Sequence, residues 1–109
     1  MYSEKVVLCG ANSYEEKYYF NPDFSQLPEV VQEELKIMCV LYVHDVGGIL
    51  TLVFDEDGEL QFEVTATECD PMFDEIGSRL KIKQLQVEKE ELLEALQMFY
   101  KVFFLGEEM

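Results

Sequence analysis

The segment from Gly47 to Thr67, GGILTLVFDEDGELQFEVTAT, constrains the fold more than any other part of the chain. Its Asp57-Gly58 pair stands between two runs in which apolar and polar residues alternate, and this arrangement is the strongest short-range signal of a β-hairpin. With a two-residue loop, each face of the hairpin would be half polar. With a three-residue loop, in which Gly58 adopts a left-handed conformation in a bulge, Phe54 pairs with Leu60.

The three-residue loop is favoured because it sorts the side chains cleanly onto two faces. A shift of one residue would move every side chain to the wrong face. In this register one face carries Leu50, Leu52, Phe54, Leu60, Phe62 and Val64. The other face carries Thr51, Val53, Asp55, Glu59, Gln61, Glu63 and Thr65. We therefore predict an antiparallel hairpin with one apolar and one acidic face.

Length and composition predict one globular domain over residues 1–109. The chain is 49% hydrophobic and contains eight Phe and six Tyr, which is too apolar for a disordered acidic tail. A chain of this length can bury a core without disulfide bonds or a structural metal. Three cysteines, none in a CxxC pair, and an opening segment without a signal-peptide pattern lead us to expect a cytoplasmic protein.

The charge balance limits the partners that the chain can bind. With 23 acidic and eight basic residues, the net charge is −15, and this field opposes direct binding to nucleic-acid phosphates or to anionic membranes. The longest apolar run, Ile37 to Val43, is too short to span a bilayer. The acidity serves either solubility or the recognition of a basic partner.

Two further strands are predicted before the first helix. Lys5 to Cys9 has the continuous apolar run of a covered strand, and Glu16 to Phe20 is rich in aromatic residues. The residues Gly10 to Ser13 between them are turn-forming, so the two strands can form a second hairpin. Asn21-Pro22-Asp23 ends the second strand.

The first long helix is predicted from Leu27 to Asp45, with Pro28 at its first position. One face carries Leu27, Val31, Leu35, Met38 and Tyr42 at helical spacing. Beyond Lys36, however, the segment Ile37 to Val43 is apolar all round. It must be covered by the sheet and the last helix or by a second subunit, or else it is a buried strand that follows a shorter helix.

Asp70 as a cap and Pro71 at the first position predict another helix start, and Phe73, Ile76 and Leu80 follow at helical spacing. Residues 79–87 stay open between helix and strand, because charged and apolar residues alternate there. The final helix is predicted from Glu88 to Leu105. Its wide apolar stripe consists of Leu92, Leu93, Leu96, Phe99, Tyr100, Phe103 and Phe104.

These elements predict an α+β fold with two layers. An antiparallel sheet with the central hairpin at about residues 48–67 packs its apolar face against two long helices, at about residues 28–45 and 88–105.

No pattern in the chain predicts a catalytic, cofactor-binding or metal-binding residue. When Gly58 is placed at the sixth position of an EF-hand loop, Val53 and Val64 fall where oxygen ligands are required. Cys39 and His44 lie five residues apart, which on a helix separates a nucleophile from its base. Adjacent carboxylates are expected by chance in so acidic a chain, and no glycine-rich phosphate loop is present.

A basic strip and the acidic hairpin face are the best candidates for an interaction surface. Arg79, Lys81 and Lys83, with Lys89 nearby, hold half of the eight basic residues. They could meet the hairpin acids Asp55, Glu59 and Glu63, either within a subunit or reciprocally across a twofold contact. A solvated charged surface without such a role is the simpler interpretation.

Four segments resemble a family of short uncharacterised bacterial proteins that carry a domain of unknown function. They are LCGANSYEEKYYFNPDF, VGGILTLVFDEDGEL, IGSRLKIKQLQ and ELLEALQMFYKVFF. The resemblance covers nearly the whole chain and implies a bacterial cytosolic protein without an assigned activity. It carries over no functional residue.

The sequence thus favours a non-enzymatic protein-interaction or regulatory module that binds a protein partner or a second copy of itself as a homodimer. An acidic inhibitor that imitates nucleic-acid charge and binds a basic protein is the alternative, and an enzyme of unknown type is the third hypothesis. No cofactor is expected.

Overall fold

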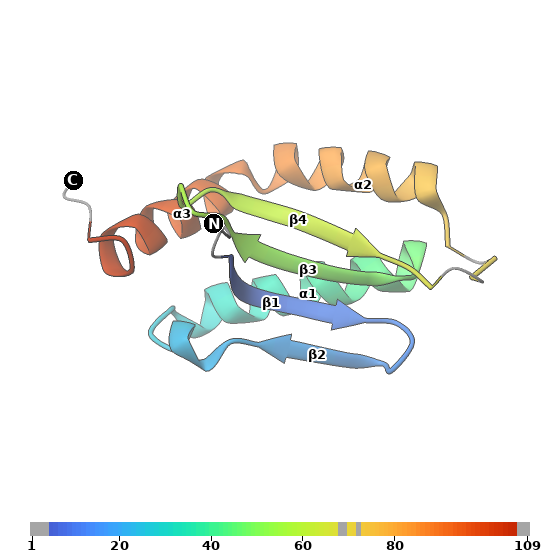
Figure 1. Cartoon of the computed structure of the whole chain (residues 1–109), viewed down its shortest axis with the longest axis horizontal. Helices are drawn as coiled ribbons and strands as arrows, with labels where there is room; N and C mark the ends of the chain where they lie inside the picture. The colour runs from blue at the N-terminus through green and yellow to red at the C-terminus, as the bar shows by residue number, and fades with distance from the viewer. Residues whose placement is uncertain (1–4, 68–69, 72, 107–109) are drawn as a thin grey trace.

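The computed structural model describes residues 5–67, 70–71 and 73–106. Its fold is α+β, with a four-stranded antiparallel sheet in the order β2-β1-β3-β4 and three helices packed against it (Figure 1). The elements are β1 (Val6–Asn12), β2 (Lys17–Phe20), a 3₁₀ turn (Pro22–Phe24), α1 (Glu29–Val46), β3 (Ile49–Phe54), β4 (Leu60–Thr65), α2 (Glu75–Glu88) and α3 (Glu90–Phe103). The α+β prediction is confirmed, with a third helix beyond the two that were expected.

The predicted hairpin register is confirmed. Phe54 pairs with Leu60, and Leu52 pairs with Phe62. Gly58 has φ +85°, and its N–H donates to the Asp55 carbonyl at 3.0 Å. Three of the predicted apolar-face residues, Leu50, Leu52 and Phe54, are fully buried. The apolar face of the hairpin therefore forms one side of the hydrophobic core.

The first strand is longer than predicted, because Gly10 to Asn12 belong to β1 and not to a turn. Gly10 pairs with Tyr19 on one side and Thr51 on the other. A Cβ atom at Gly10 would lie 2.8 Å from the Leu50 carbonyl oxygen, so glycine here permits close approach of two strands. Gly10 therefore does not belong to a turn; it lies where β1 and β3 approach closely. The second strand and its hairpin with the first are confirmed.

Helix α1 continues to Val46, so the competing prediction of a strand at residues 37–43 is wrong. Leu35, Cys39 and Tyr42 recur at helical spacing and are fully buried, which fixes the whole segment as helix. The helix starts at Glu29, and Pro28 is its N-cap. In Figure 1 α1 lies behind the sheet, and its closest packing is against β1.

The predicted cap at Asp70 is wrong, because α2 begins at Glu75 with Asp74 as its N-cap. The Asp74 Oδ1 atom accepts the Gly77 N–H at 2.8 Å. The Asp70 carboxylate accepts the hydroxyl of Tyr14 instead, and Asp70 lies four residues before the observed N-cap. Residues 68–69 and 72, which belong to the predicted start signal, lie outside the described residues.

Residues 79–87 are helical, and α2 buries a different face from the one that the spacing indicated. Ser78 and Leu85 are buried, whereas Ile76 and Leu80 are exposed. The predicted final helix from residue 88 is correspondingly too long, because Lys89 separates α2 from α3.

Helix α3 closes the core with a stack of aromatic rings. The rings of Phe54 and Tyr100 are 4.3 Å apart between centroids and nearly parallel, at 7°. Phe24 of the 3₁₀ turn stacks on Phe54 at 5.6 Å and on Phe104 at 4.7 Å. The aromatic stripe predicted for the last helix therefore belongs largely to the core, although Phe103 remains exposed.

Candidate interaction surfaces

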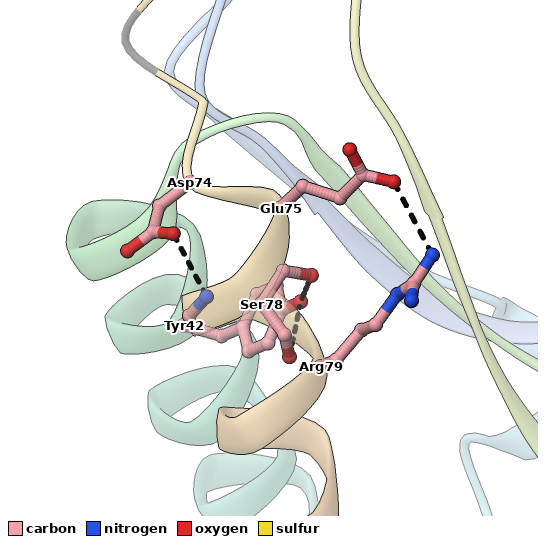
Figure 2. A network of polar contacts seen from close by, with 6 residues as sticks. Tyr42, Asp74, Glu75, Ser78 and Arg79 are labelled. Atoms are coloured by element: carbon pink, nitrogen blue, oxygen red, sulfur yellow. Dashed lines mark hydrogen bonds and ion pairs between the residues drawn. The ribbon is translucent and has the colours of Figure 1, made fainter.

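A buried polar contact joins α1 to α2 (Figure 2). The Tyr42 hydroxyl shares a hydrogen bond with the Ser78 hydroxyl, and it also donates to the Ser78 carbonyl at 3.3 Å. Burial raises the pKa of Tyr42, so its phenol stays protonated near neutral pH. The contact places α2 beside α1.

Two ion pairs lie along the same helix pair. Lys81 Nζ is 3.1 Å from Asp45 Oδ2, and Lys89 Nζ is 3.3 Å from Glu34 Oε2. All four side chains are partly exposed to solvent. Such pairs are expected to contribute less than about 1 kcal/mol each, so they orient the helices more than they stabilise them.

The predicted basic strip is divided by the fold. Lys81 faces α1, whereas Arg79 pairs with Glu75 of its own helix at 3.3 Å and remains exposed (Figure 2). Lys83 is exposed and has no ion-pair partner within the described part of the chain. Among those residues, no cation of the strip forms an ion pair with a hairpin acid.

The three hairpin acids Asp55, Glu59 and Glu63 also do not act as one surface, because their contacts differ. The Asp55 carboxylate accepts hydrogen bonds from the backbone N–H groups of Asp57 and Glu59 at 2.9 and 3.0 Å, and from the side-chain amide of Gln61 at 3.0 Å. These hydrogen bonds lower the pKa of Asp55, and the bond from the Glu59 N–H has the largest effect. Glu63 pairs with Lys5 at 2.6 Å.

Glu59 is exposed at the end of the loop. Of the three predicted acids, Asp55 therefore stabilises the turn, and Glu63 forms an ion pair with Lys5, the residue before β1.

A groove of about 580 Å³ lies between α1 and α2, and we call it the α1–α2 groove. Met38, Tyr42 and Leu85 line it together with the exposed Ile37 and Leu41. Its charged residues are Glu33, Glu34, Lys81, Glu88 and Lys89. The groove is thus an apolar channel with a charged rim.

The face of α1 that points away from the sheet is apolar and uncovered. Val30, Ile37 and Leu41 are 77%, 54% and 53% exposed. The sequence indicated that residues 37–43 needed a cover, and the fold covers only one side of them. Val30 was missed, although its seven-residue spacing from Ile37 places both on one face.

Helix α2 has an exposed apolar stripe of its own. Ile76, Leu80 and Val87 are 74%, 63% and 74% exposed. They lie opposite Ser78 and Leu85, which face α1 and the core. Ile76 and Leu80, whose helical spacing predicted a buried face, therefore lie on the solvent-exposed face of α2.

Cys39 and His44 do not form a nucleophile–base pair, because Cys39 is buried and His44 is exposed. Cys39 is buried instead against Cys9 of β1, with 3.8 Å between the sulfur atoms. Hydrogen bonding with Cys9 and burial both raise the pKa of the Cys39 thiol. No sequence signal predicted this contact, because the two residues belong to distant elements. Cys69 lies outside the described residues.

Among the described residues, no group of three or more His, Cys, Asp or Glu side chains is placed to hold a metal ion. In the same residues no helix has the length and apolar character needed to cross a membrane.

Comparison with known proteins gives one informative match. The model of a family described as a family of unknown function (DUF6145) matches residues 5–108. No curated protein and no solved structure matches the chain.

Proposed function

Because the chain belongs to the DUF6145 family, whose function is unknown, we propose its function from its surfaces: it is a non-enzymatic protein-interaction module that docks a partner in the α1–α2 groove. The observation that carries the proposal is the uncovered apolar face of α1, formed by Val30, Ile37 and Leu41.

This face differs from ordinary scattered surface apolar residues. The three side chains share one helix face, and all three line a groove together with Met38 and Tyr42. Exposed apolar side chains that gather around a hollow are typical of an interaction site. Burying two such side chains against a partner is favourable by roughly 1.5 to 3 kcal/mol each.

The groove has the form that binds an amphipathic helix. An apolar channel accepts the apolar residues of a helix at positions i, i+3, i+4 and i+7, and a charged rim selects the residues beside them. Lys81 and Lys89 on the rim are already paired with Asp45 and Glu34. Glu33 and Glu88 have no ion-pair partner among the described residues, so the rim offers negative charge.

The charge of the whole chain favours a basic partner over a second copy. Two chains that each carry a net charge of −15 repel one another, most strongly at low salt. A helix with basic residues beside its apolar face is attracted by the same field. The acidic-mimic alternative has less support, because Asp55 and Glu63 are engaged within the chain.

The test is a pulldown at low and high salt with three baits, read by mass spectrometry. The baits are the natural chain, the double variant Ile37→Asp/Leu41→Asp, and the matched double variant Ile76→Asp/Val87→Asp on the α2 stripe. All four positions are exposed, so each variant is expected to fold, and both add the same charge.

We expect a partner that is retained by the natural and α2-variant baits and lost from the α1-variant bait. Loss from the α2 variant alone, or identical capture by all three baits, would exclude the groove as the docking site. Light scattering of the purified chain gives the third outcome, since a dimer abolished by the α1 variant identifies a second copy as the occupant.

A further inference from the structure

A second hollow, of about 570 Å³, lies between the turn that joins β1 to β2 and the flank of α1. We call it the turn pocket. Ala11 of β1 and Val40 and Val43 of α1 give it apolar walls. Its volume falls in the range of pockets that bind small molecules.

Basic side chains gather at the turn pocket although the chain as a whole is strongly acidic. Lys17, Lys36 and His44 line it, against the one carboxylate of Glu16. Neither lysine has an ion-pair partner among the described residues. The α1–α2 groove, in contrast, is lined by more acidic than basic residues. The two lysines outnumber the single carboxylate, and the apolar walls beside them strengthen their field, which favours an anion in the turn pocket.

Neutral hydrogen-bond donors accompany these cations. Asn12 Oδ1 accepts the N–H groups of Tyr14 and Glu15 at 2.9 and 3.2 Å, which leaves the Asn12 NH₂ group as the donor available to a ligand. The Tyr18 hydroxyl is buried and has no hydrogen-bond partner within the described residues. Burial, followed by the nearby thiol of Cys9, raises the pKa of Tyr18, so its phenol stays protonated and adds no negative charge beside the pocket.

We propose that the turn pocket binds a small organic monocarboxylate, with the carboxylate at Lys17 and Lys36 and the apolar part of the ligand against Val40 and Val43. Lysine ammonium groups provide the attraction, and the apolar walls favour a ligand with a ring or a short chain over a bare inorganic anion. This site is separate from the α1–α2 groove and does not depend on the docking of a protein there.

The test is a titration of the ¹⁵N-labelled full chain followed by amide chemical shifts. The probes are benzoate and octanoate, with neutral benzamide and inorganic phosphate as comparisons. We expect one of the carboxylates, at concentrations up to about 10 mM, to produce saturable shifts at Asn12, Tyr18 and Val40. Benzamide lacks the charge and phosphate lacks the apolar part, so both are expected to bind at least about tenfold more weakly.

Two matched variants separate a specific site from general charge. Lys36→Gln is expected to weaken carboxylate binding by about tenfold or more. Lys83→Gln removes the same charge from the surface of α2 and is expected to leave binding unchanged. The proposal is overturned if neither carboxylate gives saturable shifts, if both variants weaken binding equally, or if phosphate binds as well as the carboxylates.

Discussion

Tyr42 of α1 and Ser78 of α2 share a hydrogen bond inside the core, and it connects the two helices that form the α1–α2 groove. Ser78 is 4% exposed, so neither hydroxyl can exchange this partner for water. The register of α2 against α1 therefore depends on a buried polar contact as well as on the two partly exposed ion pairs.

Tyr42→Phe and Ser78→Ala should each lower the free energy of unfolding by about 1 to 2 kcal/mol, because each removes the buried hydrogen bond between the two hydroxyls. The double variant should lose less than the sum of the two, with a coupling of about 1 kcal/mol. Urea denaturation measures all three. Tyr19→Phe, on an exposed ring, is the control and should change nothing. Strictly additive losses would show that the two hydroxyls do not interact.

Gly58→Ala should destabilise the hairpin loop. Gly58 has φ +85°, where an L side chain is strained by roughly 1 to 2 kcal/mol, and its Cβ would lie 2.8 Å from Lys101 Cγ. Gly106→Ala is the control, since φ is +73° there but no atom lies within 4 Å. Thermal or urea unfolding should show a larger loss for Gly58→Ala, and equal losses would mean that the contact with Lys101 contributes nothing.

Asp55 should make the stability of the hairpin sensitive to acid. Its pKa is lowered in the folded chain, chiefly by the Glu59 N–H, so its contribution is complete above the unfolded pKa of about 4 and is lost as the pH falls through the folded pKa. The difference in unfolding free energy between the natural chain and Asp55→Asn should therefore narrow from pH 7 to pH 3. Urea denaturation across this range measures it. A constant difference would contradict the shift, and Asp57→Asn serves as the control.

Phe24→Leu should cost about 1 to 2 kcal/mol of stability, because it removes ring contacts with Phe54, Tyr100 and Phe104 and leaves a small cavity. Phe103→Leu changes the same residue type at a side chain that is 65% exposed, and should stay within about 0.5 kcal/mol of the natural chain. Equal effects in urea denaturation would show that α3 does not close the core as described.

Cys9 and Cys39 should resist modification in the folded chain. Both side chains are buried, and the pKa of Cys39 is raised, so few thiolates are present and reagents cannot reach them. In a Cys69→Ser variant at pH 8, a disulfide reagent should titrate no thiol in buffer and both thiols in urea. Rapid reaction of the folded variant would mean that β1 and α1 open locally.

The sequence by itself determined the hairpin register and placed Leu35, Met38 and Tyr42 on one face of the first helix, although it left residues 37–43 open between helix and strand. Both follow from periodicity, because a slip of one residue at Phe54 would expose the whole apolar set, and because Leu35, Cys39 and Tyr42 meet the sheet only if the segment is helical. Such periodic patterns can be recognised within one segment, without knowing which distant residues contact it.

Only the tertiary structure decided the remaining features, because each depends on a partner far along the chain. Helix α2 begins after Asp74, whereas the Asp70 carboxylate accepts the Tyr14 hydroxyl, and Gly10 lies in a strand because it pairs with Tyr19 and Thr51. Residues 79–87 form a helix that turns Ser78 toward Tyr42. The α1–α2 groove exists only when these long-range contacts are made, so no local pattern could have predicted it.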